Sequence, residues 1–442
     1  MKTDYQPAVS SPHIFLIVIV AIYVVLGVLY ATLTPTWQVP DEPAHYNYIR
    51  SLAEGRGFPV IEPGDYDQDY LSRLTTEKFP PELSIEPLEY ADHHPPLYYL
   101  LATPVYLLFD GAVLPLRLLS VLFGAALLVV AFGTVRATFP ARPELALMAA
   151  GFIAFIPQHV AMTAGVENDA LAELIVGGGL WALVIYLGGD RDRPWPIGLL
   201  LAAALLTKPQ AYVVLGVATV AVVLRWRRER RTVRWAMGQL AWLFTPALLL
   251  SAPWFIRNGL TYGWSDLTGL ARHDEVVAEQ MRTSEFLALH GWEAYWERAL
   301  TFTFQSFWSQ LGWMAVPLPS RVYQALALLS ALLSVGFIIH LVQYRRRPAP
   351  PLSRSSAPLL LALSAFLTLA SYVWYNLTFV QHQGRYLFPA LIPIGTAAAL
   401  GLSTLANVLP RRIRPWGLVT FFTGLAAFNV YCLFKSIPFL TN

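Results

Sequence analysis

Residues 14–46 read IFLIVIVAIYVVLGVLYATL-TPTW-QVPDEPAHY, an uncharged run followed within a few residues by two adjacent acids. The run is about twenty residues long, which suits a membrane-spanning helix better than a signal-peptide core. Asp41 and Glu42 would then lie at the mouth of a span, where a partly buried acid is costly. Pro-Asp-Glu-Pro has a second explanation, because it can break one helix and cap the next with Asp41.

The composition of the whole chain agrees with this first segment. The 442 residues are 56% hydrophobic and 13% charged, and a soluble chain carries roughly twice that share of charge. The only cysteine, Cys432, excludes an intramolecular disulfide framework. We therefore expect an all-α polytopic membrane protein with a single integral membrane domain, residues 1–442, that binds no nucleic acid.

Uncharged runs long enough to approach the thickness of a bilayer recur along the chain. The eleven candidates are 14–33, 118–135, 145–166, 174–189, 194–207, 209–224, 235–256, 322–344, 357–379, 386–408 and 415–434. With the N-terminus in the cytoplasm, the connections on that side carry eighteen of the 31 basic residues. This orientation makes 35–115 and 257–320 extracytoplasmic loops, 345–358 a cytoplasmic linker and the C-terminus extracytoplasmic. We expect a plasma-membrane protein, of bacterial origin.

Two stretches are too short to span. Residues 97–109 form an apolar piece rich in tyrosine, which predicts an interfacial helix within the first outer loop. The runs 194–207 and 209–224 are joined only by Lys208-Pro209. Their connection is expected to end just inside the outer surface, with Lys208 facing a cavity lined by protein.

Unusual polar residues collect on the outer side in this topology, although each cluster alone is typical of a turn. They are Asp41-Glu42, Asp92-His93-His94, Glu167-Asn168-Asp169, Lys208 and Gln383-Gly384-Arg385-Tyr386.

These motifs, taken in order, resemble the GT-C superfamily of integral membrane glycosyltransferases. They are PDEPAHY (40–46), HHPPLYY (93–99), END (167–169), TKP (207–209) and GRYLFP (384–389). The resemblance is to the branch of protein O-mannosyltransferases and aminoarabinose transferases. It implies a lipid-phosphate-linked sugar donor and a catalytic acid in the first outer loop. The acceptor would be a glycan, lipid or protein hydroxyl. Where the aminoarabinose enzymes have Glu-Lys, this chain has His93-His94, which puts the family's roles for that position in doubt.

The chemistry of such a transfer assigns roles to the clustered residues. A polyprenyl-phosphate leaving group is a stable anion, so one base suffices where glycosidases need two carboxylates. Asp41 is the expected base, with Glu42 as the alternative. Arg385, then Lys208, would bind the donor phosphate together with Tyr386; a structural ion pair is the other explanation for Arg385. Asp169 would position the acceptor or bind a divalent cation.

The remaining cluster residues have less specific expectations. His45, His93, His94, Glu167 and Asn168 would contact the acceptor or shape the site. Asp41, Asp169 and His93 are the candidate ligands if a magnesium, manganese or zinc ion takes part. Adjacent histidines are nevertheless more typical of hydrogen-bonding turns than of metal sites. The aromatic run between Trp292 and Trp313 is either an interfacial belt or the lining of an isoprenoid groove.

Two other functions compete with a hexosyl- or pentosyltransferase. A lipid or sugar transporter or flippase predicts ionisable residues at mid-membrane and repeated halves, and only Glu173 partly meets this. An envelope polysaccharide polymerase or ligase would favour arginines in the outer loops, whereas 35–115 is acidic.

Overall fold

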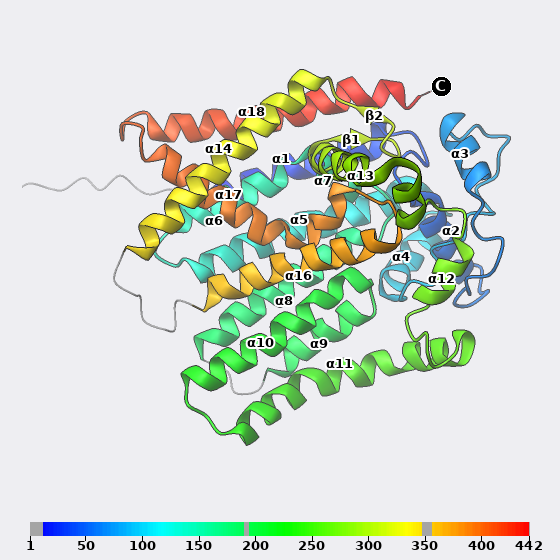
Figure 1. Cartoon of the computed structure of the whole chain (residues 1–442), viewed down its shortest axis with the longest axis horizontal. Helices are drawn as coiled ribbons and strands as arrows, with labels where there is room; N and C mark the ends of the chain where they lie inside the picture. The colour runs from blue at the N-terminus through cyan, green and yellow to red at the C-terminus, as the bar shows by residue number, and fades with distance from the viewer. Residues whose placement is uncertain (1–11, 190–193, 347–355, 442) are drawn as a thin grey trace, which may run out of the picture.

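A computed structural model of the protein describes residues 12–189, 194–346 and 356–441. Within these ranges, nine helices are long and apolar enough to cross a membrane, and Figure 1 shows them side by side in one bundle. They are α1 (Pro12–Leu33), α5 (Val113–Thr138), α8 (Asp169–Gly188), η1 with α10 (Pro209–Tyr212, Val213–Arg228), α11 (Val233–Tyr262), α14 (Ser320–Arg345), α16 (Ala357–Thr378), η2 with α17 (Gly384–Ala390, Leu391–Ala406) and α18 with η3 (Arg414–Ser436, Ile437–Phe439). The expectation of an all-α polytopic membrane protein is confirmed.

The other two predicted spans are irregular, so a count of eleven full spans is not confirmed. The first of them is split into α6 (Pro143–Ala154) and α7 (Pro157–Thr163), which are bent by 68°. Pro157 lies at the break, where it cannot donate the helical hydrogen bond. The second, α9 (Trp195–Leu205), has eleven residues and is too short to span.

Two spans begin earlier than the uncharged runs predicted. The helix predicted from 118 begins at Val113, and the helix predicted from 174 begins at Asp169. In both cases the predicted start directly follows a charged residue, and the structure shows that this residue is paired inside the protein. Arg117 forms an ion pair with Glu42 at 2.6 Å, and Glu173 forms a hydrogen bond with His159 Nε2 at 2.9 Å. Pairing lowers the cost of burying each charge, so the helices extend through these positions.

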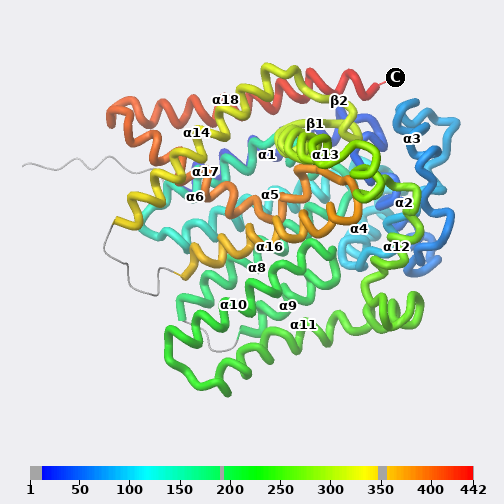
Figure 2. The backbone as a smooth tube through the Cα atoms, in the orientation of Figure 1, coloured from blue at the N-terminus to red at the C-terminus, as the bar shows by residue number. Residues whose placement is uncertain are grey.

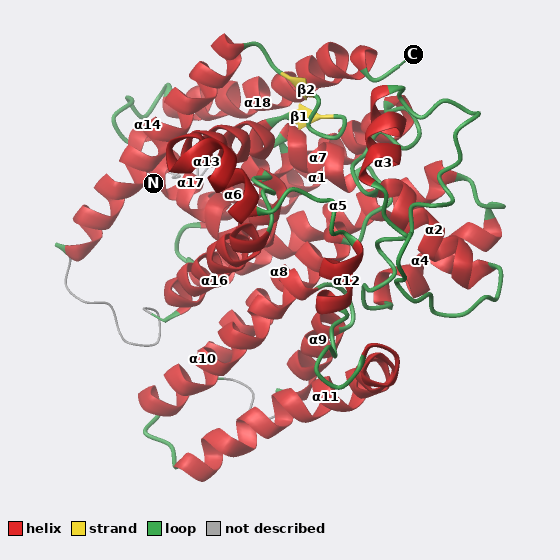
Figure 3. Ribbon diagram, turned by 45° about the vertical axis from the view of Figure 1, so that its right-hand side comes forward, coloured by secondary structure: helices red, strands yellow, loops and turns green. Residues whose placement is uncertain are grey.

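Short helices gather at one end of the bundle, near the C-terminus (Figures 1 and 3). They are α2 (Glu42–Ala53), α3 (Gln68–Thr76), α4 (Leu97–Leu108) and α12 (Leu270–Val276). A second small core lies beside α3 and the end of α12, with Leu74, Leu88, Val277 and Phe379 buried together. The connection between α10 and α11 lies at the opposite end (Figure 2).

The helix α13 (Thr283–Trp308), which is kinked at Gly291, differs in direction from the spans. Figures 1 and 2 show it foreshortened, because it runs across the axes of the long helices. It is followed by a hairpin of two short strands, β1 (Gln310–Leu311) and β2 (Val316–Pro317).

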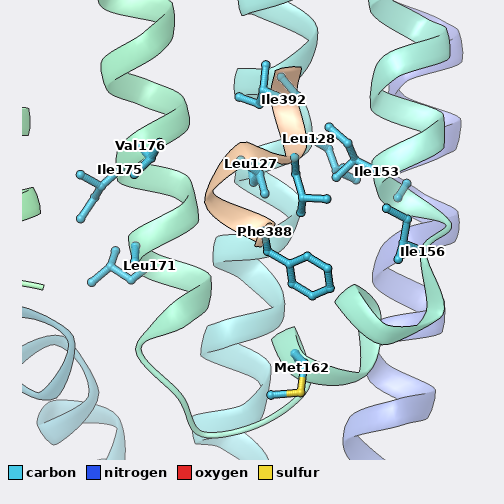
Figure 4. Packing of buried hydrophobic residues seen from close by; sticks show 14 of the residues in the cluster. Leu127, Leu128, Ile153, Ile156, Met162, Leu171, Ile175, Val176, Phe388 and Ile392 are labelled. Atoms are coloured by element: carbon cyan, nitrogen blue, oxygen red, sulfur yellow. The ribbon is translucent and has the colours of Figure 1, made fainter. Parts of the chain in front are cut away.

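The main core fixes the position of η2. Phe388 of η2 and Ile392 of α17 lie among the side chains of α5, α6 and α8, including Leu127, Ile153 and Ile175 (Figure 4). Arg385, which precedes Phe388 by three residues, is therefore held on a rigid element.

The orientation of the bundle in the membrane is a testable prediction from the arginine asymmetry. Single cysteines at the exposed positions Asp69 and Arg227, in a Cys432→Ser background, are expected to react with an impermeant thiol reagent from opposite sides. Asp69 would be labelled in intact cells and Arg227 only after permeabilisation. Labelling of both positions in intact cells would contradict the topology.

Other parts of the predicted topology rest on residues that the structure does not describe. The segments 1–11 and 190–193, and positions 347–355 of the predicted linker, lie outside the described residues. Their cytoplasmic location stays a prediction.

Candidate functional site

Asp41 lies directly before α2 in a left-handed backbone conformation, with φ of 65°. This conformation is uncommon for a residue with a side chain and often marks a functional position. Its carboxylate makes no capping hydrogen bond to α2. Instead Oδ1 accepts from the Tyr90 hydroxyl at 2.9 Å, and Oδ2 forms an ion pair with Arg385. The side chain of Asp41 is thus directed towards η2 and does not cap its own helix.

Arg385 is held by three protein groups. Its Nε donates to Gln383 Oε1 at 2.7 Å and its Nη1 to Glu167 Oε1 at 2.8 Å, while Nη2 contacts Asp41. The preceding Gly384 lies against the backbone of α13, so closely that a Cβ atom would clash there. Glycine is therefore required at this position, and it places the guanidinium between three segments.

Lys208 and Asp169 complete the network. Lys208 follows α9, and its ammonium forms an ion pair with the carboxylate of Asp169, the first residue of α8. Glu167 lies two residues earlier, within hydrogen-bonding range of Asp169. At one end of the bundle, four separate stretches of chain thus bring together three carboxylates and two cationic side chains.

The five charged side chains differ in access to solvent. Asp41 is 27% exposed and Asp169 is 19% exposed, whereas Lys208, Arg385 and Glu167 are at most 8% exposed. A cavity beside them is lined by Asp169, Ala172, Glu173, Gln210, Arg385, Tyr386 and Pro389. Asp41 is the most accessible carboxylate of the network, as a group that reacts with an incoming substrate must be.

Glu42 lies outside this network. Its side chain is fully buried, and both oxygens accept hydrogen bonds from Arg117, at 2.7 and 2.6 Å. The backbone amides of Trp37 and Val166 also donate to it, at 3.0 and 3.1 Å. A carboxylate with all its acceptor positions occupied inside the protein is a structural anchor between α1, α2 and α5.

The surroundings of the site favour the ionised form of Asp41 and the protonated form of Glu167. Burial alone would raise the pKa of Asp41, but the charge and hydrogen bond of Arg385 outweigh it and hold that pKa below its ordinary value. Burial, and then the charge of Asp169, raise the pKa of Glu167 well above its usual range. At neutral pH, Asp41 is therefore a carboxylate.

The predicted histidines lie together near the network. His45 Nδ1 is 2.8 Å from the Tyr99 hydroxyl, and its ring stacks on His94 at 5.7 Å. The ring centroid of His93 lies 4.1 Å from that of His94 and 4.4 Å from that of His273 of α12. Burial, followed by the charge of Lys208, lowers the pKa of His45 to about 3. The imidazole of His45 is therefore neutral at neutral pH.

The predicted metal ligands do not form a binding set. Nowhere in the described ranges do three or more His, Cys, Asp or Glu side chains converge on a point where a metal ion would fit. His93 directs Nδ1 to the carbonyl of Tyr90 at 3.1 Å, while Asp41 and Asp169 each face a cation of the protein. The residues present therefore do not fit the expected magnesium, manganese or zinc site.

The structure places several further residues at or beside the site. Tyr90 and Gln383 bond Asp41 and Arg385, and Arg117 anchors Glu42. Of the residues predicted from the sequence, Tyr386 lines the cavity, and Asn168 is fully buried with neither side-chain amide atom bonded to a described residue. Arg117 could have been found from the sequence as an isolated charge at the edge of an apolar run; Tyr90 had no such signal.

Known structures resemble the fold at low sequence identity. The oligosaccharyltransferase of Archaeoglobus fulgidus, tethered to an acceptor peptide, matches with a TM-score of 0.50 and 14% identity. The match covers 96% of this chain and 55% of that one, so the protein spans about half the length of this neighbour. ArnT from Cupriavidus metallidurans, bound to undecaprenyl phosphate, has a TM-score of 0.49 and 15% identity, with 95% and 72% coverage.

The match to the Archaeoglobus fulgidus oligosaccharyltransferase, a GT-C enzyme, confirms the expected GT-C-like fold. A search of curated protein sequences found no match to this chain. The profile of a family described as "Predicted membrane protein (DUF2142)" matches residues 84–393, which include END, TKP and GRYLFP. The protein belongs to the DUF2142 family of membrane proteins.

Proposed function

We propose that the protein is a glycosyltransferase that moves a sugar from a polyprenyl-phosphate donor to an acceptor hydroxyl at the extracytoplasmic membrane face. The observation that carries the proposal is the network of Asp41, Glu167, Asp169, Lys208 and Arg385 at one end of the bundle. It combines an accessible carboxylate with two buried cations on a GT-C fold. Fold alone would not license the activity; the site chemistry supports it.

The two cations suit the donor phosphate. Arg385 presents a planar fork that matches phosphate oxygens, and Lys208 supplies a point charge beside it. In the absence of ligand, both are neutralised by carboxylates. An arriving phosphate would therefore take Arg385 from Asp41. Release from Arg385 removes the main influence that lowers the pKa of Asp41, so donor binding would make Asp41 a stronger base.

The reaction then needs one proton transfer. Asp41 accepts the proton of the acceptor hydroxyl while that oxygen forms a bond to the anomeric carbon of the sugar. The bond from this carbon to the phosphate oxygen breaks, and its electron pair leaves with the polyprenyl phosphate. Arg385 and Lys208 stabilise the charge that develops on this leaving group. Because the described residues do not fit a metal site, none of these reaction steps is assigned to a metal ion.

Other residues of the network would position these groups. Glu167 and Gln383 orient the guanidinium of Arg385, and Asp169 orients Lys208. Tyr90 fixes the carboxylate of Asp41 through a hydrogen bond. Glu42 acts in this proposal as a structural anchor and not as the alternative base.

Donor binding provides the first test. Arg385→Ala is expected to weaken binding of undecaprenyl phosphate by about tenfold or more, because a charge-assisted hydrogen bond contributes about 1.5–3 kcal/mol. Arg385→Lys is expected to recover only part of the affinity, since lysine cannot form a bidentate pair of hydrogen bonds to the phosphate. Titration calorimetry in detergent would measure both.

The control for this experiment is Arg73→Ala, which removes an exposed arginine paired with the exposed Glu77. This variant is expected to bind like the wild type. Unchanged affinity in both Arg385 variants would make Arg385 a structural residue and would move the phosphate site to Lys208.

A transporter is the second candidate, and the observation that favours it is the buried pair of His159 and Glu173 at 2.9 Å. Ionisable residues inside the bundle often mark a transport path. A transporter would move labelled polyprenyl-phosphate sugar across proteoliposomes without consuming it. A glycosyltransferase would release polyprenyl phosphate only when an acceptor is present.

A further inference from the structure

A group of buried polar atoms without hydrogen-bond partners lies between α13 and the segment before η2. His382 is 3% exposed, yet neither ring nitrogen has a hydrogen-bond partner among the described residues. Arg298 of α13 has a buried Nε that is also unpaired within the described part of the chain. Buried polar groups are nearly always bonded, so such a concentration of exceptions indicates a missing partner.

The rings around these atoms are aromatic, and no described carboxylate forms an ion pair with Arg298. The guanidinium of Arg298 lies over the ring of Phe302, 4.3 Å from its centroid. The ring of His382 meets Tyr295 edge-on at 4.8 Å. Burial lowers the pKa of Arg298, and no neighbouring carboxylate offsets this. Arg298 is therefore a partly buried cation without an ion-pair partner among the described residues, and its countercharge would come from outside these residues.

The direction of α13 and its outer surface show where that countercharge would come from. The helix runs across the spans (Figures 1 and 2) and is not one of the membrane-crossing helices. Trp292, Trp296 and Leu300, at four-residue spacing, are 56–70% exposed on one face. A helix that lies crosswise with exposed tryptophans is typical of the boundary between lipid tails and headgroups. At this depth the available anions are lipid phosphates.

We propose that Arg298 and His382 form a binding site for the phosphate of an anionic membrane phospholipid, separate from the network around Asp41 and Arg385. Arg298 would contribute the charge and a two-pronged hydrogen bond. His382 would donate one N–H to a phosphate oxygen. Burial, and then the charge of Arg298, lower the pKa of His382 to about 4, so the imidazole is neutral and offers a single donor.

The site also has a place in the architecture. His382 precedes Gly384 by two residues, and Gly384 lies directly against the backbone of α13. A phosphate held by both Arg298 and His382 would therefore join α13 to the segment that leads into Arg385. The proposal does not depend on the proposed glycosyl transfer, because it concerns different side chains and a different ligand.

The test measures binding of phosphatidylglycerol, and of diacylglycerol with the same acyl chains but no phosphate, to the detergent-purified protein by native mass spectrometry. The wild type is expected to retain phosphatidylglycerol at least about tenfold more tightly than diacylglycerol at one site, because diacylglycerol lacks the phosphate that makes the charge-assisted contact. Arg298→Gln is expected to abolish this preference, and His382→Phe to reduce it. Arg298→Lys, which keeps the charge and is the safer variant for folding, is expected to keep part of it.

The matched control is Arg321→Gln, which removes an exposed arginine near the start of α14 and is expected to retain the preference. Inorganic phosphate serves as a further probe. Equal retention of the two lipids by the wild type would overturn the proposal. So would an unchanged preference in Arg298→Gln, or full displacement of phosphatidylglycerol by millimolar inorganic phosphate, which would indicate a site for free phosphate.

Discussion

Asp41→Asn is expected to reduce glycosyl transfer by about 10²- to 10⁴-fold, the usual contribution of a positioned base. Asparagine keeps the shape of aspartate and can still accept hydrogen bonds from Tyr90 and Arg385, but it cannot take up the proton of the acceptor. The loss is therefore expected in turnover, with donor binding retained. The rate would be measured as release of polyprenyl phosphate from donor extracted from the producing cells.

The matched control for this prediction is Asp69→Asn, which changes an exposed acid in the same outer region and is expected to leave turnover unchanged. A helix cap tolerates asparagine almost as well as aspartate. Near-wild-type turnover of Asp41→Asn, at equal expression and equal donor binding, would show that Asp41 is not the base.

Glu42→Gln is expected to destabilise the protein by about 3–5 kcal/mol, because it leaves the guanidinium of Arg117 as an uncompensated buried charge. Arg117→Met is expected to cost at least as much. Arg117 also donates to the carbonyls of Ala31, Thr34 and Pro35 at 2.7–3.1 Å, so its loss leaves further buried acceptors unpaired. Denaturant titration in detergent would measure the change in the free energy of unfolding.

The surface pair of Arg50 and Glu86 provides the comparison, since Glu86 is 68% exposed. Glu86→Gln is expected to change stability by about 0.5 kcal/mol or less. Turnover per folded molecule of Glu42→Gln is expected to stay close to the wild type. Normal stability combined with lost turnover would instead assign Glu42 to the chemistry.

Much of the fold could be predicted from the sequence because bilayer thickness imposes a length on each apolar run. The errors arose where charged residues are paired inside the protein. The uncharged run stops at Arg117, and nothing local reveals that Glu42, 75 residues away, neutralises this charge. Glu173 has the same effect on the predicted start of α8, because the uncharged run begins only after this residue. The bend before Pro157 was also missed, because its two halves form one continuous apolar run.

The residues of the candidate site could be proposed from the sequence, but their pairing could not. Positive-inside topology predicts that Asp41, Glu167, Asp169, Lys208 and Arg385 share one membrane face, and the structure brings them together. Which carboxylate faces which cation depends on how η2 packs against α13 and α8. That packing separates Asp41 from Glu42, two adjacent acids with opposite environments. It also leaves the candidate metal ligands facing other partners.

The proposed function of the network around Asp41 and Arg385 is the transfer of a sugar to a component of the cell envelope. Its most direct test is mass spectrometry of envelope glycans and glycolipids from cells that lack the protein, complemented with the wild type or with Asp41→Asn. One sugar-bearing species is expected to disappear in the deletion strain, return with the wild type and remain absent with Asp41→Asn. Identical glycan and glycolipid profiles in all three strains would contradict the account.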